Sequence, residues 1–109
     1  MARTGHDGLW HIYAIVEKRD RDAQVKIGKT KGAVETRRGT LQSGNWRTLV
    51  VWRVAEALNE RQAERIENEV HIWLSEHALG REWFDCTPQF AWHAVERAIF
   101  LMQNPLDSN

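Results

Sequence analysis

The order in which apolar patterns change along the chain constrains its fold more than any other feature. Residues 9–17 read LWHIYAIVE, a run of aromatic and β-branched types, and the polar run KRDRDA separates them from QVKIG at residues 24–28. Two strand-like runs joined by a short polar segment predict an antiparallel hairpin. Residues 48–57, TLVVWRVAEA, have the same character and predict a third strand of the same sheet.

Three other segments carry helical signals. Residues 33–43 are followed by Gly44, a typical C-terminal stop. A helix over residues 60–77 is preceded by Asn59 as an N-cap, and a third helix over residues 88–103 begins with a threonine and a proline. The buried stripe of this last helix is expected to comprise Phe90, Ala91, Ala94, Val95, Ala98, Ile99 and Met102.

The segments therefore run β, β, α, β, α, short β, α, with REWF at residues 81–84 as the short extended piece. This order predicts a single small α/β (α+β) domain over residues 1–109, with a core over residues 9–84. We expect a three-stranded, mainly antiparallel sheet flanked by helices. A chain of 109 residues is long enough for one hydrophobic core of this kind.

Two further features bear on where such a chain works. The uninterrupted runs of aliphatic and aromatic residues, such as Leu49 to Trp52, are far shorter than the roughly 20 residues of a membrane-spanning helix. The single cysteine, Cys86, cannot form an internal disulfide, which fits a reducing compartment. We therefore expect a cytoplasmic protein without a membrane partner.

The net charge is zero, but the charges are segregated along the chain. Residues 18–47 carry nine basic side chains against three acidic ones, and residues 56–96 carry nine acidic against three basic. A basic first half fits a phosphate-facing surface and therefore a nucleic-acid partner. Two solvated faces of opposite sign explain the same pattern, so charge alone does not decide.

The long helix contains one residue that breaks its pattern. At roughly 100° per residue, its buried stripe comprises Ala63, Ile66, Val70, Trp73 and Leu74. Glu67 falls at the edge of this stripe, where a carboxylate is costly unless a cation, a metal or hydrogen-bond donors compensate it. Glu67 either forms a salt bridge or extends its carboxylate to solvent, or else it has a functional role. His71 lies one turn further along the same edge, where a structural role is also common.

Candidate partners for a phosphate lie in the basic half. Tyr13 shares a strand face with His11 and Ile15 and is either a core aromatic or a functional phenol. Lys26 in the partner strand is near enough, in principle, to lower the pKa of that phenol. Arg37 and Arg38 form either a solvated basic face or a guanidinium site for phosphate.

Five short motifs occur in order on the expected strands and helices. They are His11-Ile12-Tyr13; Lys26-Ile27-Gly28 followed by Lys29-Thr30; Arg37 four residues before Leu41; Ala63-x-x-Ile66-Glu67-x-x-x-His71; and Gly80-x-Glu82-Trp83-Phe84. Together they resemble the motifs of the GIY-YIG nucleases, in particular the compact branch associated with phages and bacteria that has KIG as its second motif. The resemblance covers roughly residues 9–84.

The resemblance implies metal-dependent hydrolysis of phosphodiester bonds. It assigns to Glu67 one divalent cation, Mg²⁺ or Mn²⁺, because hard oxygen ligands suit these ions. Tyr13, its pKa lowered by Lys26, would position or activate the attacking water, and Arg37 would neutralise charge on the phosphate. Lys26 and His71 complete the expected catalytic set, with Lys29 as a supporting phosphate contact.

Two positions depart from the usual family motifs. His11 stands in place of the first-motif glycine, and Lys26 stands in place of the second-motif tyrosine. Lysine recurs at this position in the branch, so we interpret the motifs as a variant. Whether the variant keeps full activity stays open at this stage.

Three functions remain in competition. The first is an endonuclease, monomeric or weakly dimeric, with DNA favoured and single-stranded or flapped substrates in view, because Trp46 is a candidate stacking platform. Trp46 is otherwise a packing residue under its loop. The alternatives are a nucleic-acid-binding module without turnover and a phage-encoded protein-interaction or antagonist domain. The expected nucleic-acid contacts are Lys29, Lys31, Arg38, Trp46 and Arg47.

Overall fold

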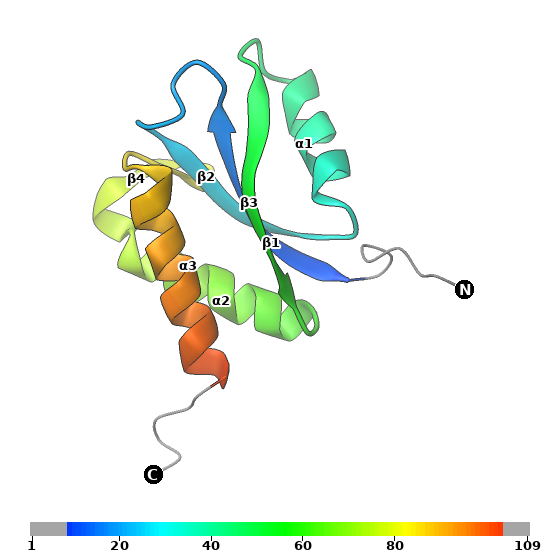
Figure 1. The fold of residues 1–109 in the computed structure, drawn as a ribbon, viewed down its shortest axis with the longest axis vertical. Helices are drawn as coiled ribbons and strands as arrows, with labels where there is room; N and C mark the ends of the chain where they lie inside the picture. The colour runs from blue at the N-terminus through cyan, green and yellow to red at the C-terminus, as the bar shows by residue number, and fades with distance from the viewer. Residues whose placement is uncertain (1–8, 104–109) are drawn as a thin grey trace.

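The computed structural model describes residues 9–103. The predicted hairpin is present: β1 (Trp10–Glu17) pairs antiparallel with β2 (Val25–Lys31), and Tyr13 lies opposite Gly28. β3 (Leu49–Ala57) pairs antiparallel with the other side of β1, with an irregularity between Ala14 and Ile15. β1 is thus the central strand of the predicted three, and Figure 1 shows it between its two partners.

The prediction of a three-stranded sheet is wrong in its count. The sheet has five strands in the order β3-β1-β2-β5-β4, because β4 (Ala78–Gly80) and β5 (Trp83–Phe84) form a small antiparallel hairpin beside β2. These strands have only three and two residues. β5 lies within the short extended piece predicted over residues 81–84. The sequence does not predict β4, because so short a strand shows no alternation.

Two of the three helices begin where their caps predict. α1 (Val34–Ser43) begins one residue after the predicted start at Ala33, has no side-chain cap and ends at Gly44, the predicted stop. α2 (Glu60–Trp73) begins after Asn59, whose side chain accepts the backbone N–H of Gln62 at 2.9 Å. The α-helix ends at Trp73, four residues before the predicted end at His77, and a 3₁₀ turn (Ser75–His77) continues the path.

α3 (Pro88–Gln103) is capped by Thr87, whose hydroxyl accepts the backbone N–H of Phe90 at 3.1 Å. Its buried face differs from the predicted stripe: Phe90 is 52% exposed, and Trp92 is buried instead. Trp92 packs edge-on against Trp52 of β3 at 6.4 Å between ring centroids. The helical angle alone does not show which edge of the stripe meets the sheet.

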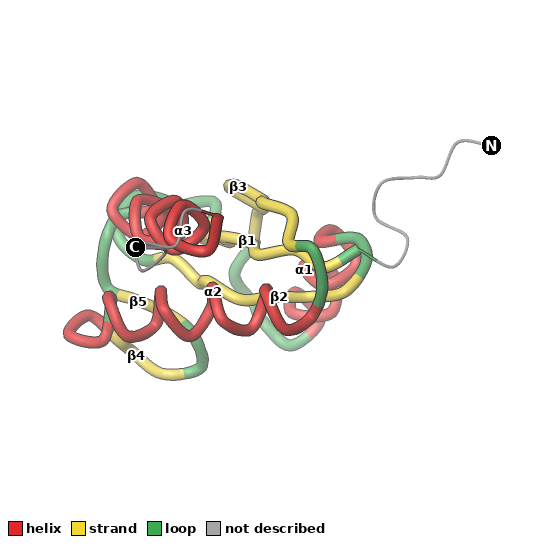
Figure 2. The backbone as a smooth tube through the Cα atoms, turned by 90° about the horizontal axis from the view of Figure 1, so that it is seen from below, coloured by secondary structure: helices red, strands yellow, loops and turns green. Residues whose placement is uncertain are grey.

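Two cores hold the sheet between the helices. The larger joins α2 and α3 to the face that carries Ile12, Ala14 and Val16, and the smaller joins α1 to the face that carries Tyr13 and Ile15. In Figure 2, α2 is seen from the side and α3 nearly end-on, so the two helices cross at a steep angle. Within residues 9–103, no helix has the length and apolar character needed to cross a membrane.

Candidate active site

The candidate site lies at the edge of β2, where the short strand β5 begins. β5 pairs with Val25 and Lys26, and Gly28 follows two residues later, opposite Tyr13 of β1. A Cβ atom on Gly28 would lie 2.5 Å from the phenol oxygen of Tyr13 and 2.8 Å from Oε1 of Glu82. The Tyr13 phenol and the Glu82 carboxylate therefore lie where the side chain of any residue other than glycine would begin. A larger residue at position 28 would displace them.

Because Tyr13 and Glu82 lie so close to Gly28, the substitution Gly28→Ala is expected to destabilise the protein. Tyr13 is fully buried and has no room to swing away from the new methyl group, so the substitution should lower the free energy of unfolding by about 1 to 3 kcal/mol. Urea unfolding measures the loss. Gly39→Ala in α1 is the matched control, because a Cβ atom at Gly39 would meet no heavy atom within 4 Å. The control should gain about 0.5 to 1 kcal/mol from helix propensity, and an equal loss in both variants would contradict the assignment.

Arg37 on α1 reaches the same phenol. Its Nε–H donates to the Tyr13 hydroxyl at 3.5 Å, which brings a guanidinium to the reactive end of the tyrosine. Burial raises the pKa of Tyr13 above its ordinary value, and the hydrogen bond from Arg37 opposes that rise without overcoming it. The expectation that Lys26 lowers this pKa is therefore wrong, because burial dominates and the opposing contribution comes from Arg37.

Lys26 instead holds the turn between β4 and β5. Its buried ammonium donates to the backbone carbonyl of Arg81 at 2.6 Å and lies 3.4 Å from Oε1 of Glu82. Burial lowers the pKa of Lys26, and the neighbouring carboxylate of Glu82 opposes this shift. Lys26 is thus in the site, as the sequence predicts, but its contacts are with the turn.

Glu82 is the residue of the site to which the sequence motifs alone assign no role. It follows Gly80 and Arg81 in a turn where all three residues have positive φ, at 101°, 56° and 70°. This region is unfavourable for the two residues with side chains, and such strain persists where the surrounding contacts hold it in place. The Gly80-x-Glu82-Trp83-Phe84 motif is the available signal, but the sequence does not show that its glutamate turns inward.

Glu67 of α2 is buried at the edge of the core, as its helical position predicts. Its side chain is 3.7 Å from the ammonium of Lys29, while Oε2 is buried and has no hydrogen-bond partner within the described residues. Burial, followed by the nearby negative charge of Glu82, raises the pKa of Glu67 to about 7. A buried carboxylate oxygen without a donor is costly, and a bound cation would satisfy it.

His71 completes a group of three potential metal ligands. One ligand atom each from Glu67, His71 and Glu82 lies within 4.8 Å of the others. His71 Nε2 is 3.1 Å from the carbonyl oxygen of Ile27. If Nε2 carries the proton and donates to this carbonyl, the lone pair of Nδ1 is free for a ligand, an arrangement that is common for metal-binding histidines. Two carboxylates and one imidazole suit a divalent cation.

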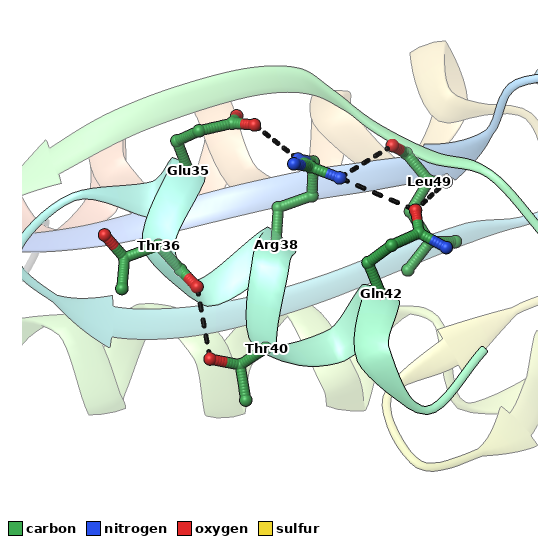
Figure 3. A network of polar contacts seen from close by, with 6 residues as sticks. All are labelled: Glu35, Thr36, Arg38, Thr40, Gln42 and Leu49. Carbon is green, nitrogen blue, oxygen red and sulfur yellow. Dashed lines mark hydrogen bonds and ion pairs between the residues drawn. The ribbon is translucent and has the colours of Figure 1, made fainter.

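The residues predicted to contact nucleic acid have different surroundings in the structure. Lys29 faces Glu67, and Lys31 is exposed at the end of β2. The guanidinium of Arg38 is bonded to Glu35, to Gln42 and to the Leu49 carbonyl, so it fixes the loop after α1 (Figure 3). Trp46 is 87% exposed and does not pack under its loop, and the Arg47 guanidinium lies over its ring at 4.9 Å.

Comparison with known proteins identifies one domain family. No curated protein and no solved structure matches the chain significantly. The T5orf172 domain matches residues 10–101, which span β1 to α3 and include every residue of the candidate site. The chain therefore belongs to the T5orf172 domain family.

Proposed function

We propose that this protein is a metal-dependent endonuclease that hydrolyses phosphodiester bonds, related to the GIY-YIG nucleases. One observation carries the proposal: the buried Oε2 atom of Glu67, which has no hydrogen-bond partner among residues 9–103, belongs to a compact group of three side chains that could hold a metal ion. The Tyr13 hydroxyl, which accepts a hydrogen bond from Arg37, lies close to Glu82 beside Gly28, so a phosphate bound there would have both a cation and a guanidinium near it. Membership in the T5orf172 family supports a nucleic-acid substrate.

Glu67, Glu82 and His71 would hold the cation. Mg²⁺ or Mn²⁺ suits this set, because both ions favour carboxylate oxygens and Mn²⁺ also accepts imidazole. When bound, such an ion supplies Lewis-acid stabilisation of the charge that develops on the leaving oxygen. Lys26 lies within ion-pair distance of Glu82, and Lys29 lies within ion-pair distance of Glu67, so each carboxylate has a cationic neighbour.

The remaining residues bind and orient the phosphate. The Arg37 guanidinium keeps further N–H donors beyond the one it gives to Tyr13, and these suit the non-bridging oxygens of a phosphodiester. Tyr13 retains its proton at neutral pH, because burial raises its pKa, so its hydroxyl is suited to donate a hydrogen bond to a phosphate oxygen or to the attacking water. Lys26 holds the turn that carries Glu82 and so keeps the Glu82 carboxylate in the site.

The same fact about Tyr13 favours one second candidate function. A phenol that keeps its proton is a poor general base, and a domain with this site would bind nucleic acid without cutting it. This candidate is a nucleic-acid-binding module of the same fold. In either case we propose DNA as the favoured partner, a monomeric or weakly dimeric protein, and a cytoplasmic location.

The two functions differ in one assay. Purified protein is incubated with end-labelled DNA and RNA, each single-stranded and double-stranded, with Mg²⁺, with Mn²⁺ or with a chelator. An endonuclease gives internal cleavage products in the presence of either cation, and the chelator abolishes them. A shifted but intact probe under every condition would favour the binding module and refute the nuclease.

Glu82→Gln tests the proposed role of Glu82 as a cation ligand. Removing one of two carboxylates should raise the Mg²⁺ concentration needed for half-maximal cleavage by about tenfold or more, because ligand and supporting residues of metal sites commonly have effects of this size. Calorimetric titration of Mg²⁺ provides a readout that does not depend on cleavage. Glu76→Gln, on the exposed 3₁₀ turn, is the control. Equal cation affinity in wild type and Glu82→Gln would exclude Glu82 as a ligand.

A further inference from the structure

Trp46 is the most exposed large apolar side chain in the described part of the chain, at 87%. We infer that it is the stacking platform of a subsite that binds an unpaired stretch of a nucleic-acid strand. The inference rests on the proposed function for the identity of the ligand, but the subsite lies outside the candidate metal site. Three observations support it: the hydrogen bonds that hold the loop of Trp46, the two hollows next to this loop, and the charged side chains that line these hollows.

The loop that presents Trp46 is held by side-chain hydrogen bonds. Nε2 of Gln42 donates to the carbonyls of Asn45 at 3.0 Å and Arg47 at 2.7 Å, and Oε1 of Gln42 accepts the backbone N–H of Leu49 at 2.8 Å. The Asn45 side chain accepts the backbone N–H of Arg47 at 2.9 Å. Figure 3 shows how Gln42 and Leu49 come together at this end of α1. The exposure of Trp46 is therefore fixed by a built scaffold, as a preorganised contact residue requires.

Trp46 and Arg47 form a wall between two hollows. One, of about 600 Å³, lies between the loop after α1 and the turn between β4 and β5, and the other, of about 680 Å³, lies against the end of β1. Both hollows are open to solvent and are not enclosed pockets. The charged side chains that line the two hollows are Lys18, Arg19, Arg47, Arg81 and one acidic residue, Glu17, which forms an ion pair with Arg47 at 2.5 Å. A flat aromatic ring with a surplus of cations is the usual composition of a site that binds single-stranded nucleic acid.

The first hollow leads toward the candidate active site. Trp83 lines it and also packs against the smaller core, which contains Tyr13. Arg81 lines it as well, and its backbone carbonyl accepts the hydrogen bond from Lys26. A strand lying in this hollow would therefore have its next phosphates close to the turn that carries Glu82. The bases must be unpaired, because in a duplex both faces of each base are already stacked.

A second pair of tryptophan and arginine supplies a matched comparison. Trp73 at the end of α2 is 50% exposed, and the guanidinium of Arg97 lies over its ring at 4.2 Å. This pair lines a smaller hollow of about 320 Å³ between α2 and α3, with Leu74, Phe90, His93 and Ala94 as the other lining residues. It has the same tryptophan and arginine chemistry, but among the described residues it has neither the cluster of cations nor a connection to Tyr13 or Glu82.

The test is equilibrium binding in chelator, measured by fluorescence anisotropy with one labelled sequence prepared as single-stranded DNA, single-stranded RNA and blunt DNA duplex. Trp46→Ala should weaken binding of the single strands by about tenfold or more, the size of one lost base stack, and leave duplex binding within about twofold. Trp46→Phe should retain most of the affinity, and Trp73→Ala should bind like wild type. Tighter binding of either the single-stranded DNA or the single-stranded RNA would show whether the subsite prefers deoxyribose or ribose.

Two results would overturn the inference. One is unchanged single-strand binding in Trp46→Ala, and the other is an equal loss for the single strands and the duplex. Both alanine variants change exposed side chains, so circular dichroism should show the wild-type fold. The measurement is independent of cutting: specific single-strand binding without cation-dependent products would refute the nuclease and leave the subsite standing.

Discussion

Glu67→Gln is expected to abolish cation-dependent cleavage and, in chelator at pH 8, to make the protein more stable than wild type. The loss of activity should be at least about 10²-fold, because the carboxylate is the buried member of the proposed cation site. The gain in stability follows from burial, which makes the ionised carboxylate unfavourable in the folded protein. A neutral amide of the same shape does not carry this cost.

The stability difference should depend on pH in a defined direction. The pKa of Glu67 is about 7 in the folded protein and near its ordinary value of 4.5 in the unfolded chain, so folding favours the protonated form. This contribution is fully present below about pH 4.5 and is lost as the pH rises through 7. The two proteins should therefore differ little at pH 4.5, and at pH 8 the variant should be ahead by up to about 3 kcal/mol.

Urea unfolding in chelator at several pH values measures this difference. Adding Mg²⁺ should then raise the stability of wild type and leave Glu67→Gln almost unchanged, because a ligand stabilises the state that binds it. Glu64→Gln, exposed on the same helix, is the control and should follow wild type throughout. A variant that is less stable than wild type at pH 8 would show that Glu67 is a structural salt-bridge residue.

The sequence predicts those parts of the structure that depend on local patterns. The hairpin follows from two strand-like runs, the end of α1 from Gly44, and the start of α2 from the Asn59 cap. The burial of Glu67 follows from helical geometry, because its position is fixed once the helix is placed. These features each depend on residues that are close together in the chain.

The features that the sequence does not reveal depend on contacts between distant segments. Glu82 enters the site because its backbone has positive φ and Lys26, 56 residues earlier in the chain, holds the turn. The pKa of Tyr13 depends on how deeply the phenol is buried, which a strand pattern does not give. Trp46 is exposed in a loop that Gln42 holds through hydrogen bonds to the carbonyls of Asn45 and Arg47. Propensity and spacing carry no information about any of these contacts.

The second large effect is expected for Tyr13→Phe, which should reduce the rate of cleavage by about 10²-fold or more while leaving the fold intact. The substitution removes only the hydroxyl, and the hydrogen bond that this group accepts from Arg37 is long, at 3.5 Å. The free energy of unfolding should therefore change by less than about 1 kcal/mol. Cleavage assays and urea unfolding on the same preparation separate the two effects.

Arg37→Lys combined with Tyr13→Phe tests whether the two residues act as a unit on the phosphate. Lysine keeps the charge but loses the planar array of donors, so the single change should also slow cleavage. Because Arg37 donates to the Tyr13 hydroxyl, the loss of either residue should disturb the position of the other, and the double variant should be little slower than the worse single one. Effects that multiply would mean that the phenol and the guanidinium act on separate steps, and the pair would then not form the phosphate-binding unit proposed here.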